Sequence, residues 1–168
     1  MLASTVLMTG CLTLSVYPLY TAKDLVTDIP LEGKWTDPTA KEIWEFSKGG
    51  DTYVATSPTD SHPEPVTLHV VRLGDQRFLD LTANETPSLA VEGHLFGKVW
   101  VKGDELRIQL MSSTWLEKKA REAGLAFLEL PNKDLLLTAP TADLQKLVLR
   151  YADDPAAYDE PTVLKRMR

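Results

Sequence analysis

The chain has 168 residues, and its 24 acidic side chains outnumber its 18 lysine and arginine residues, giving a net charge of −6 at pH 7. This length corresponds to a single domain, and a hydrophobic content of 43% is enough to build a core. The negative charge disfavours nucleic acid and anionic lipid as electrostatic partners. The chain has one cysteine, so no disulfide can form within it.

Residues 2–22 contain no charged side chain, and Cys11 lies within them. A free cysteine is often a small buried hydrophobe, and a membrane-spanning helix needs about 20 apolar residues. A buried core thiol and an uncleaved anchor are therefore alternative interpretations, although Pro18 disfavours a clean span. The apolar run before Cys11 is short for a signal peptide and lacks a leading lysine or arginine, which indicates a truncated leader.

Leu-Met-Thr-Gly-Cys at positions 7–11 resembles the lipobox of bacterial lipoproteins, in which the cysteine receives a diacylglyceryl group before the preceding peptide is removed. The resemblance implies a signal peptide over residues 1–10 and lipidation of Cys11. The membrane would then be a partner through acyl chains on Cys11, and stable attachment needs more than one chain. Leu12 after the cysteine implies, by the enterobacterial sorting rule, attachment to the outer membrane, facing the periplasm.

Residues 11–30 are interpreted as the lipidated cysteine and its tether, because two prolines interrupt them and no apolar periodicity is present. Folded structure is expected to begin near Leu31, so residues 31–168 form one domain. From there apolar and polar residues alternate with a period of two, which is typical of half-buried strands. The predicted strands cover residues 42–47, 53–56, 66–71, 78–82, 94–101, 105–110, 127–130 and 134–138, with a last one through Val163 and Leu164.

Two helices are predicted in the second half of the chain. Thr114 and Glu117 have capping-box spacing, which predicts a helix capped by Thr114 and ended by Gly124. Thr141 opens a second helix, whose apolar stripe is Leu144, Leu147, Val148 and Tyr151.

The predicted fold class is mainly β with two short helices, in which an antiparallel meander closes into a barrel and so removes exposed sheet edges. Gly33-Lys34-Trp35 resembles the Gly-x-Trp that opens lipocalin-like (calycin-like) barrels, where the tryptophan plugs one end. The resemblance implies that a late basic residue, Arg150 or Arg166, stacks on Trp35. An ordinary core aromatic is the alternative interpretation of Trp35.

Strings at residues 77–81, 113–116 and 137–144 are also similar to uncharacterised bacterial lipoproteins, a family without an established activity. The resemblance implies a shared fold, and in this interpretation Trp35, Thr114 and Thr141 have structural roles.

No cofactor or metal ion is predicted, and the chain is expected not to be an enzyme. The histidines, His62, His69 and His94, lack the spacing of a zinc site, although the two on strands would face a lumen together if both point inward. Motifs for a nucleophile elbow or a phosphate loop are absent from the sequence. A spatial triad stays open as a hydrolase hypothesis. Asp80, between two leucines, is expected to be partly buried in a structural role.

Two functional hypotheses remain ahead of the hydrolase. In the first, the barrel binds a small apolar molecule or a partner segment; in the second, the barrel is solid and loops at residues 58–65 and 84–89 contact other envelope proteins. Because small barrels are commonly filled by their own side chains, a cavity distinguishes the two hypotheses. The aromatic residues assigned to ligand binding in the first hypothesis are Trp44, Phe46, Tyr53, Phe96 and Trp100.

Overall fold

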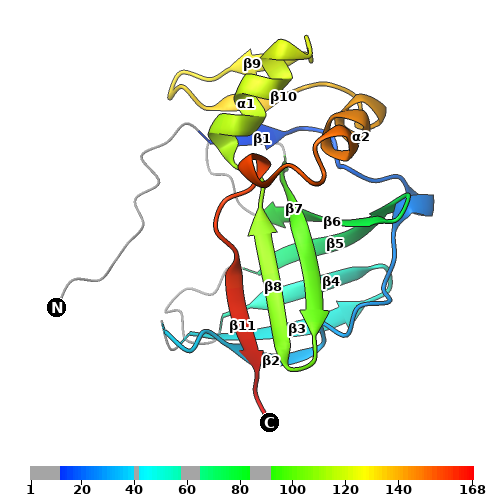
Figure 1. The fold of residues 1–168 in the computed structure, drawn as a ribbon, viewed down its shortest axis with the longest axis vertical. Helices are drawn as coiled ribbons and strands as arrows, with labels where there is room; N and C mark the ends of the chain where they lie inside the picture. Colours follow the sequence, from blue (N-terminus) through cyan, green and yellow to red (C-terminus); the bar gives the residue numbers. More distant parts are fainter. Residues whose placement is uncertain (1–11, 40–41, 58–64, 84–91) are drawn as a thin grey trace, which may run out of the picture.

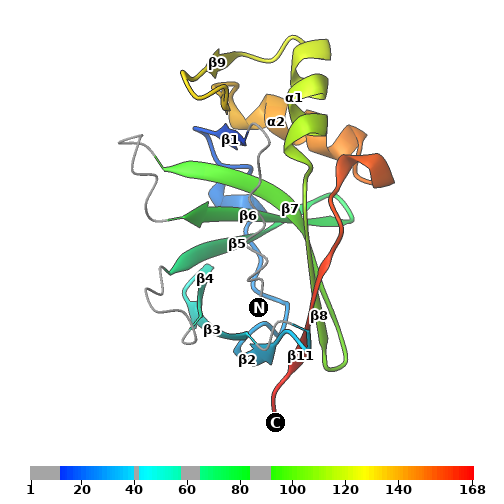
Figure 2. The same cartoon turned by 90° about the vertical axis from the view of Figure 1, so that its left-hand side faces the viewer.

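The computed structural model describes residues 12–39, 42–57, 65–83 and 92–168. Within them, eight strands form a closed antiparallel barrel, in which each strand pairs with the next along the chain and the last pairs with the first (Figures 1 and 2). The predicted meander is therefore confirmed. Its strands are β2 (Gly33–Thr36), β3 (Ile43–Gly49), β4 (Thr52–Thr56), β5 (Val66–Leu73), β6 (Gln76–Ala83), β7 (Gly93–Lys102), β8 (Glu105–Leu110) and β11 (Thr162–Arg166).

Alternation along the strands decides which side chains enter the barrel. On β5, Leu68 and Val70 are buried in the interior core, and on β7 Val99 is buried in the same core. The period-two pattern therefore separated the two faces of these strands, and the structure shows which face turns inward. The buried interior core consists of Ile29, Leu31, Trp35, Phe46, Tyr53, Ala55, Leu68, Val70, Leu79, Val99, Leu106 and Leu164.

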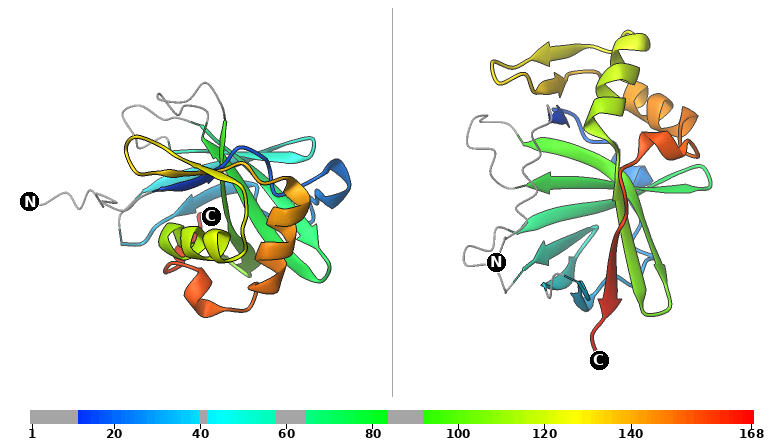
Figure 3. Two further views of the ribbon diagram at one scale, coloured as in Figure 1. Left: turned by 90° about the horizontal axis from the view of Figure 1, so that it is seen from above. Right: turned by 60° about the vertical axis from the view of Figure 1, so that its left-hand side comes forward.

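A cap of two helices and three short strands lies beside the barrel (Figure 3). Strands β1 (Thr13–Ser15), β10 (Leu135–Leu137) and β9 (Phe127–Glu129) extend the sheet from β7, and β1 runs parallel to β10. Helices α1 (Ser113–Glu122) and α2 (Thr141–Arg150) bury their apolar faces in a second core. The outward faces of β5, β6 and β7 contribute Val71, Phe78 and Phe96 to this core. Two short 3-10 helices, η1 (Ala22–Asp24) and η2 (Pro155–Ala157), complete the described elements.

The prediction that folded structure begins near Leu31 is wrong. All three residues of β1 are buried, Leu19 is completely buried, and the amide of Leu12 donates a hydrogen bond to Asp134. β1 lies between β7 and β10 in the sheet, and its polar residues Thr13 and Ser15 are buried as completely as Leu14. A three-residue strand of this kind leaves no periodic pattern in the sequence.

The end of the barrel near Gly33, its base, is closed by the segment that precedes β2. The hydroxyl of Tyr53 donates a hydrogen bond to the carbonyl of Ile29 (2.9 Å), and Nε1 of Trp35 donates one to the carbonyl of Leu31 (2.7 Å). Both aromatic side chains are buried, so each satisfies its polar atom with a backbone carbonyl of the closing segment. Trp35 therefore plugs this end of the barrel.

Arg166, on the last strand, joins the base to the first strand. Its guanidinium lies 4.1 Å from the centre of the Trp35 ring and donates hydrogen bonds to the carbonyls of Pro30 (2.6 Å) and Glu32 (2.8 Å). Gly33 has a φ of +114°, and a Cβ there would lie 3.2 Å from Arg166 Nη1. The glycine of Gly-x-Trp thus leaves room for the guanidinium, and Arg166, not Arg150, is the stacking residue.

The start of the first helix differs from the prediction, whereas the start of the second agrees with it. α1 begins at Ser113 with Ser112 as its N-cap, so Thr114 lies in the first turn and does not cap the helix. Ser113 is held by β1, because its Oγ accepts from the amide of Thr13 and its carbonyl accepts from the Thr13 hydroxyl. Thr141 opens α2 as expected, and its hydroxyl donates to the carbonyl of Pro18 (2.7 Å). Neither helix in the described part of the chain is long and apolar enough to cross a membrane.

We expect Arg166→Ala to lower the free energy of unfolding by about 1–3 kcal/mol, because it removes two hydrogen bonds to carbonyls and one cation–π contact. Arg166→Lys keeps the charge but loses the planar fork, and should recover less than half of the loss. Urea unfolding of both variants measures this. Full stability in Arg166→Ala would show that the base closes without the arginine.

Candidate functional site

The barrel interior is filled at the base and hollow at the opposite end. A pocket of about 390 Å³ opens where β2 ends and β3 begins, and we call it the mouth pocket. Its volume lies at the lower end of the range of about 300–1,000 Å³ that is usual for ligand sites. The lining residues are Asp37, Glu42, Trp44, Phe46, Ala55, Val66, Leu68, Leu81, Ile108, Leu110, Thr162 and Leu164.

The walls of the mouth pocket come from six strands of the barrel. Trp44 and Phe46 stand on β3 at the same face, and residues of β4, β5, β6, β8 and β11 supply aliphatic side chains. The polar lining residues, Asp37, Glu42 and Thr162, lie at or just beyond the ends of their strands. The arrangement is an apolar interior below a polar edge, which is the usual chemistry of a small-molecule site.

The five aromatic residues assigned to ligand binding occupy three environments. Trp44 and Phe46 line the mouth pocket, whereas Tyr53 is buried in the base with its hydroxyl bonded to Ile29. Phe96 faces away from the barrel interior and packs in the second core, and Trp100, on the same face of β7, is 37% exposed. The pattern on β7 separated its two faces correctly, but it did not indicate which face turns inward.

Most residues of the pocket were not singled out from the sequence. Val66, Leu68, Ile108 and Leu110 are aliphatic, and aliphatic strand residues equally predict core packing. Their alternation with polar neighbours was the available indication that they share the interior with Trp44.

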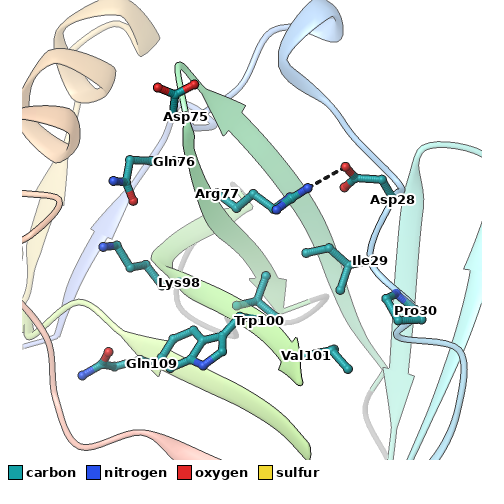
Figure 4. Close-up of a pocket in the computed structure, with 11 residues that line it drawn as sticks. Asp28, Ile29, Pro30, Asp75, Gln76, Arg77, Lys98, Trp100, Val101 and Gln109 are labelled. Atoms are coloured by element: carbon teal, nitrogen blue, oxygen red, sulfur yellow. Dashed lines mark hydrogen bonds and ion pairs between the residues drawn. The ribbon is translucent and has the colours of Figure 1, made fainter. Parts of the chain in front are cut away.

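A second pocket, of about 470 Å³, lies outside the barrel (Figure 4). Trp100 and Lys98 line it from β7, and Arg77 and Asp28 form an ion pair at its edge, with Nη2 and Oδ2 2.7 Å apart. The ladder between β6 and β7 ends at Leu79, so the two strands diverge beside this pocket.

Three charged groups of the outer pocket, Asp28, Arg77 and Lys98, are already bonded within the protein. Asp28 accepts hydrogen bonds from both Arg72 and Arg77, and the bond from Arg77 is the main cause that lowers the pKa of Asp28. The Lys98 ammonium donates to the carbonyl of Ala152. Although the outer pocket is larger, its mixture of paired charges favours no ligand class, and the mouth pocket is the better candidate site.

Comparisons of the chain with protein-family models, curated proteins and solved structures found no match. The fold is therefore assigned from the strand order alone. The chain forms a β-barrel domain that is lipocalin-like in topology.

Four polar side chains form a cluster on the outer wall of the barrel, where the segment after β1 crosses it. Asp80 is completely buried; Oδ2 accepts from the amide of Leu19 (2.6 Å), and Oδ1 lies 2.7 Å from Nδ1 of His94. We assign the hydrogen of this contact to His94 Nδ1, so that Oδ1 of Asp80 accepts. The Tyr20 ring stacks on His69 with centroids 4.4 Å apart. We call Tyr20, His69, Asp80 and His94 the outer-wall cluster.

The outer-wall cluster is separate from the mouth pocket. His69 and His94 point away from the barrel interior, so the two strand histidines do not face a common lumen. Among the described residues, no group of three or more histidine, cysteine, aspartate or glutamate side chains is placed to hold a metal ion. Asp80 is buried as expected, and its contacts connect a backbone amide to a histidine.

We expect Asp80→Asn to lower the free energy of unfolding by about 2–4 kcal/mol. The asparagine side chain has one acceptor oxygen in place of two, so it cannot accept from both Leu19 and His94. The exposed turn residue Asp75 provides the control: Asp75→Asn should change stability by less than about 0.5 kcal/mol. Thermal or urea unfolding at neutral pH measures both. Equal stabilities would contradict the structural role of Asp80.

Proposed function

We propose that this chain is a lipid-anchored lipoprotein of the bacterial envelope whose barrel binds a small apolar molecule in the mouth pocket. The mouth pocket is the observation that carries the proposal. A solid barrel would have no space beside Trp44 and Phe46, whereas here these residues and the facing aliphatic side chains line an open pocket of about 390 Å³. The proposed role is binding without catalysis.

The size and lining of the pocket indicate the kind of ligand. An apolar group gains free energy by leaving water for the apolar wall, at about 25 cal/mol per Å² of buried surface. The volume suits one small hydrophobic molecule or part of a single acyl chain rather than a complete lipid with two chains. Trp44 and Phe46 offer flat faces to an aromatic or unsaturated ligand.

The anchor and its location rest on the sequence alone. Cys11 and the lipobox-like residues before it lie outside the described residues. We propose that acyl chains on Cys11 hold the barrel at the outer membrane, facing the periplasm. Leu12 and β1 follow Cys11 directly, so the barrel and its cap would stand close to the membrane surface.

The alternative function is a structural lipoprotein that contacts other envelope proteins through loops. Residues 58–64 and 84–91, which include nearly all of the two loops assigned to this role, lie outside the described residues. The mouth pocket favours the binding function over this alternative.

Binding can be measured with N-phenyl-1-naphthylamine, a small apolar dye that fluoresces strongly out of water. We expect saturable binding by the wild type and a decrease in affinity of about tenfold or more for Val66→Phe, because the added ring occupies the pocket. Lipid extraction of the purified protein followed by mass spectrometry would then identify a natural ligand.

Val54→Phe is the matched control for this experiment. Val54 lies on the neighbouring strand β4 and alternates with the buried residues Tyr53 and Ala55, so its side chain points out of the barrel. This variant should bind the dye as the wild type does. Absence of saturable binding in the wild type, or equal affinity in Val66→Phe, would contradict the proposed function.

Mass spectrometry of the mature N-terminus tests the anchor. We expect a diacylated or triacylated Cys11 as the first residue of the protein expressed in a bacterial host, and Cys11→Ser should abolish both the acyl mass and membrane retention. An unmodified Cys11, or cleavage at another residue, would contradict the anchor without affecting the dye experiment.

A further inference from the structure

Residues 18–20 connect the cap to the barrel wall. On the cap side, the Thr141 hydroxyl donates to the carbonyl of Pro18 (2.7 Å) and the Gln145 amide donates to the carbonyl of Leu19 (2.8 Å). On the barrel side, the amide of Leu19 donates to Asp80 (2.6 Å) and Tyr20 covers His69. The outer-wall cluster therefore supplies the polar contacts that hold this segment to the barrel.

Among the described residues of the outer-wall cluster, His69 is the one whose hydrogen bonding is incomplete. Its Nε2 lies 3.2 Å from the Tyr20 hydroxyl, whereas Nδ1 is buried and has no hydrogen-bond partner within the described part of the chain. A neutral imidazole can leave Nδ1 as an acceptor and donate from Nε2 to Tyr20. The imidazolium carries a hydrogen on both nitrogens, so protonation places an unpaired N–H donor at the buried Nδ1.

The charged groups around His69 do not offset the free-energy cost of an unpaired N–H at the buried Nδ1. Asp80 stands directly opposite His69 on β6, but both of its oxygens are already used by Leu19 and His94. The charge of Asp80 nevertheless favours the charged ring, as do Glu92 and Asp51 to a smaller extent, and His94 opposes it. Burial is the largest influence, and it lowers the pKa of His69 below the ordinary value of 6.5. Burial and the nearby Asp80 also raise the pKa of Tyr20, so its hydroxyl keeps its proton.

We propose that the outer-wall cluster is an acid-sensitive latch: protonation of His69 expels Tyr20 and releases residues 18–20 from the barrel wall. Once Tyr20 leaves, the imidazolium gains access to water, which pairs both of its N–H groups. The loss of Tyr20 also exposes the contact between Leu19 and Asp80. β1 ends three residues before this segment, so its pairing with β7 through Ser15 and His94 weakens as well.

The direction of the pH effect follows from the lowered pKa of His69. Between the folded-state pKa and about 6.5, the released state binds a proton that the latched state does not. The latch is therefore at full strength above about pH 6.5 and weakens as the pH falls through this window. Among the described residues of the barrel base, held by Trp35 and Arg166, there is no histidine, so the base should not respond over the same range.

Hydrogen–deuterium exchange of the full chain at about pH 7.5 and about pH 5, corrected for the intrinsic rate, tests the latch. We expect residues 13–20 and their partner β10 to open about tenfold more often at the lower pH, while β2, β3 and β4 keep their protection. An NMR titration of the His69 ring should have its midpoint below 6.5 and coincide with the increase in exchange. Uniform loss of protection, or no change at residues 13–20, would overturn the proposal.

His69→Gln provides the decisive variant. Glutamine does not titrate in this range and can bond to the Tyr20 hydroxyl, so the acid-induced opening should disappear while the segment stays latched at both pH values. Equal opening in this variant and in the wild type would overturn the proposal. Should the variant fail to fold, the coincidence of the wild-type titration and exchange midpoints decides the matter, because separate midpoints would contradict His69 as the trigger.

Discussion

The barrel depends on a short seam between its first and last strands. β2 and β11 share only two register pairs, Lys165 with Thr36 and Arg166 with Trp35. Arg166 lengthens this seam at the base, where its guanidinium stacks on Trp35 and bonds to carbonyls of the closing segment. Beyond Thr36 the seam has no ladder, and the mouth pocket opens there between Asp37 and Thr162. The first strand has only four residues, and the mouth pocket lies at the end where it stops.

Much of the barrel was predictable because alternation is a local property. The period of two indicated six of the eight barrel strands, the apolar residues after Pro161 indicated the last, and Gly-x-Trp indicated the first. The aromatic residues of β3 and β4 were assigned to the inward faces that they occupy. On β7 the pattern was ambiguous, because Phe96 and Trp100 are as apolar as the valines on the other face. The cap covers Phe96 on the outside of the barrel, so hydrophobicity alone did not indicate the interior.

The candidate site was only partly predictable, because it depends on where packing stops. Trp44 and Tyr53 both belong to inward faces, yet one lines a cavity and the other bonds to Ile29 in the filled base. No local pattern distinguishes these environments. The same holds for β1, whose burial depends on β10, more than 100 residues later in the chain.

The second core explains why the segment before β2 is folded rather than free. The outward faces of β5, β6 and β7 carry Val71, Phe78 and Phe96, which would form an exposed apolar patch without the cap. Burying this patch requires the cap to stay seated, and residues 18–20 are tied to both parts, through Thr141 on one side and Asp80 on the other. A buried carboxylate is destabilising unless it is hydrogen-bonded, and apolar neighbours cannot supply such a bond. Asp80 obtains one from the amide of Leu19, so its need for a donor fixes the path of the segment. The polar contacts thus set where the cap sits, while the apolar contacts supply most of its stability.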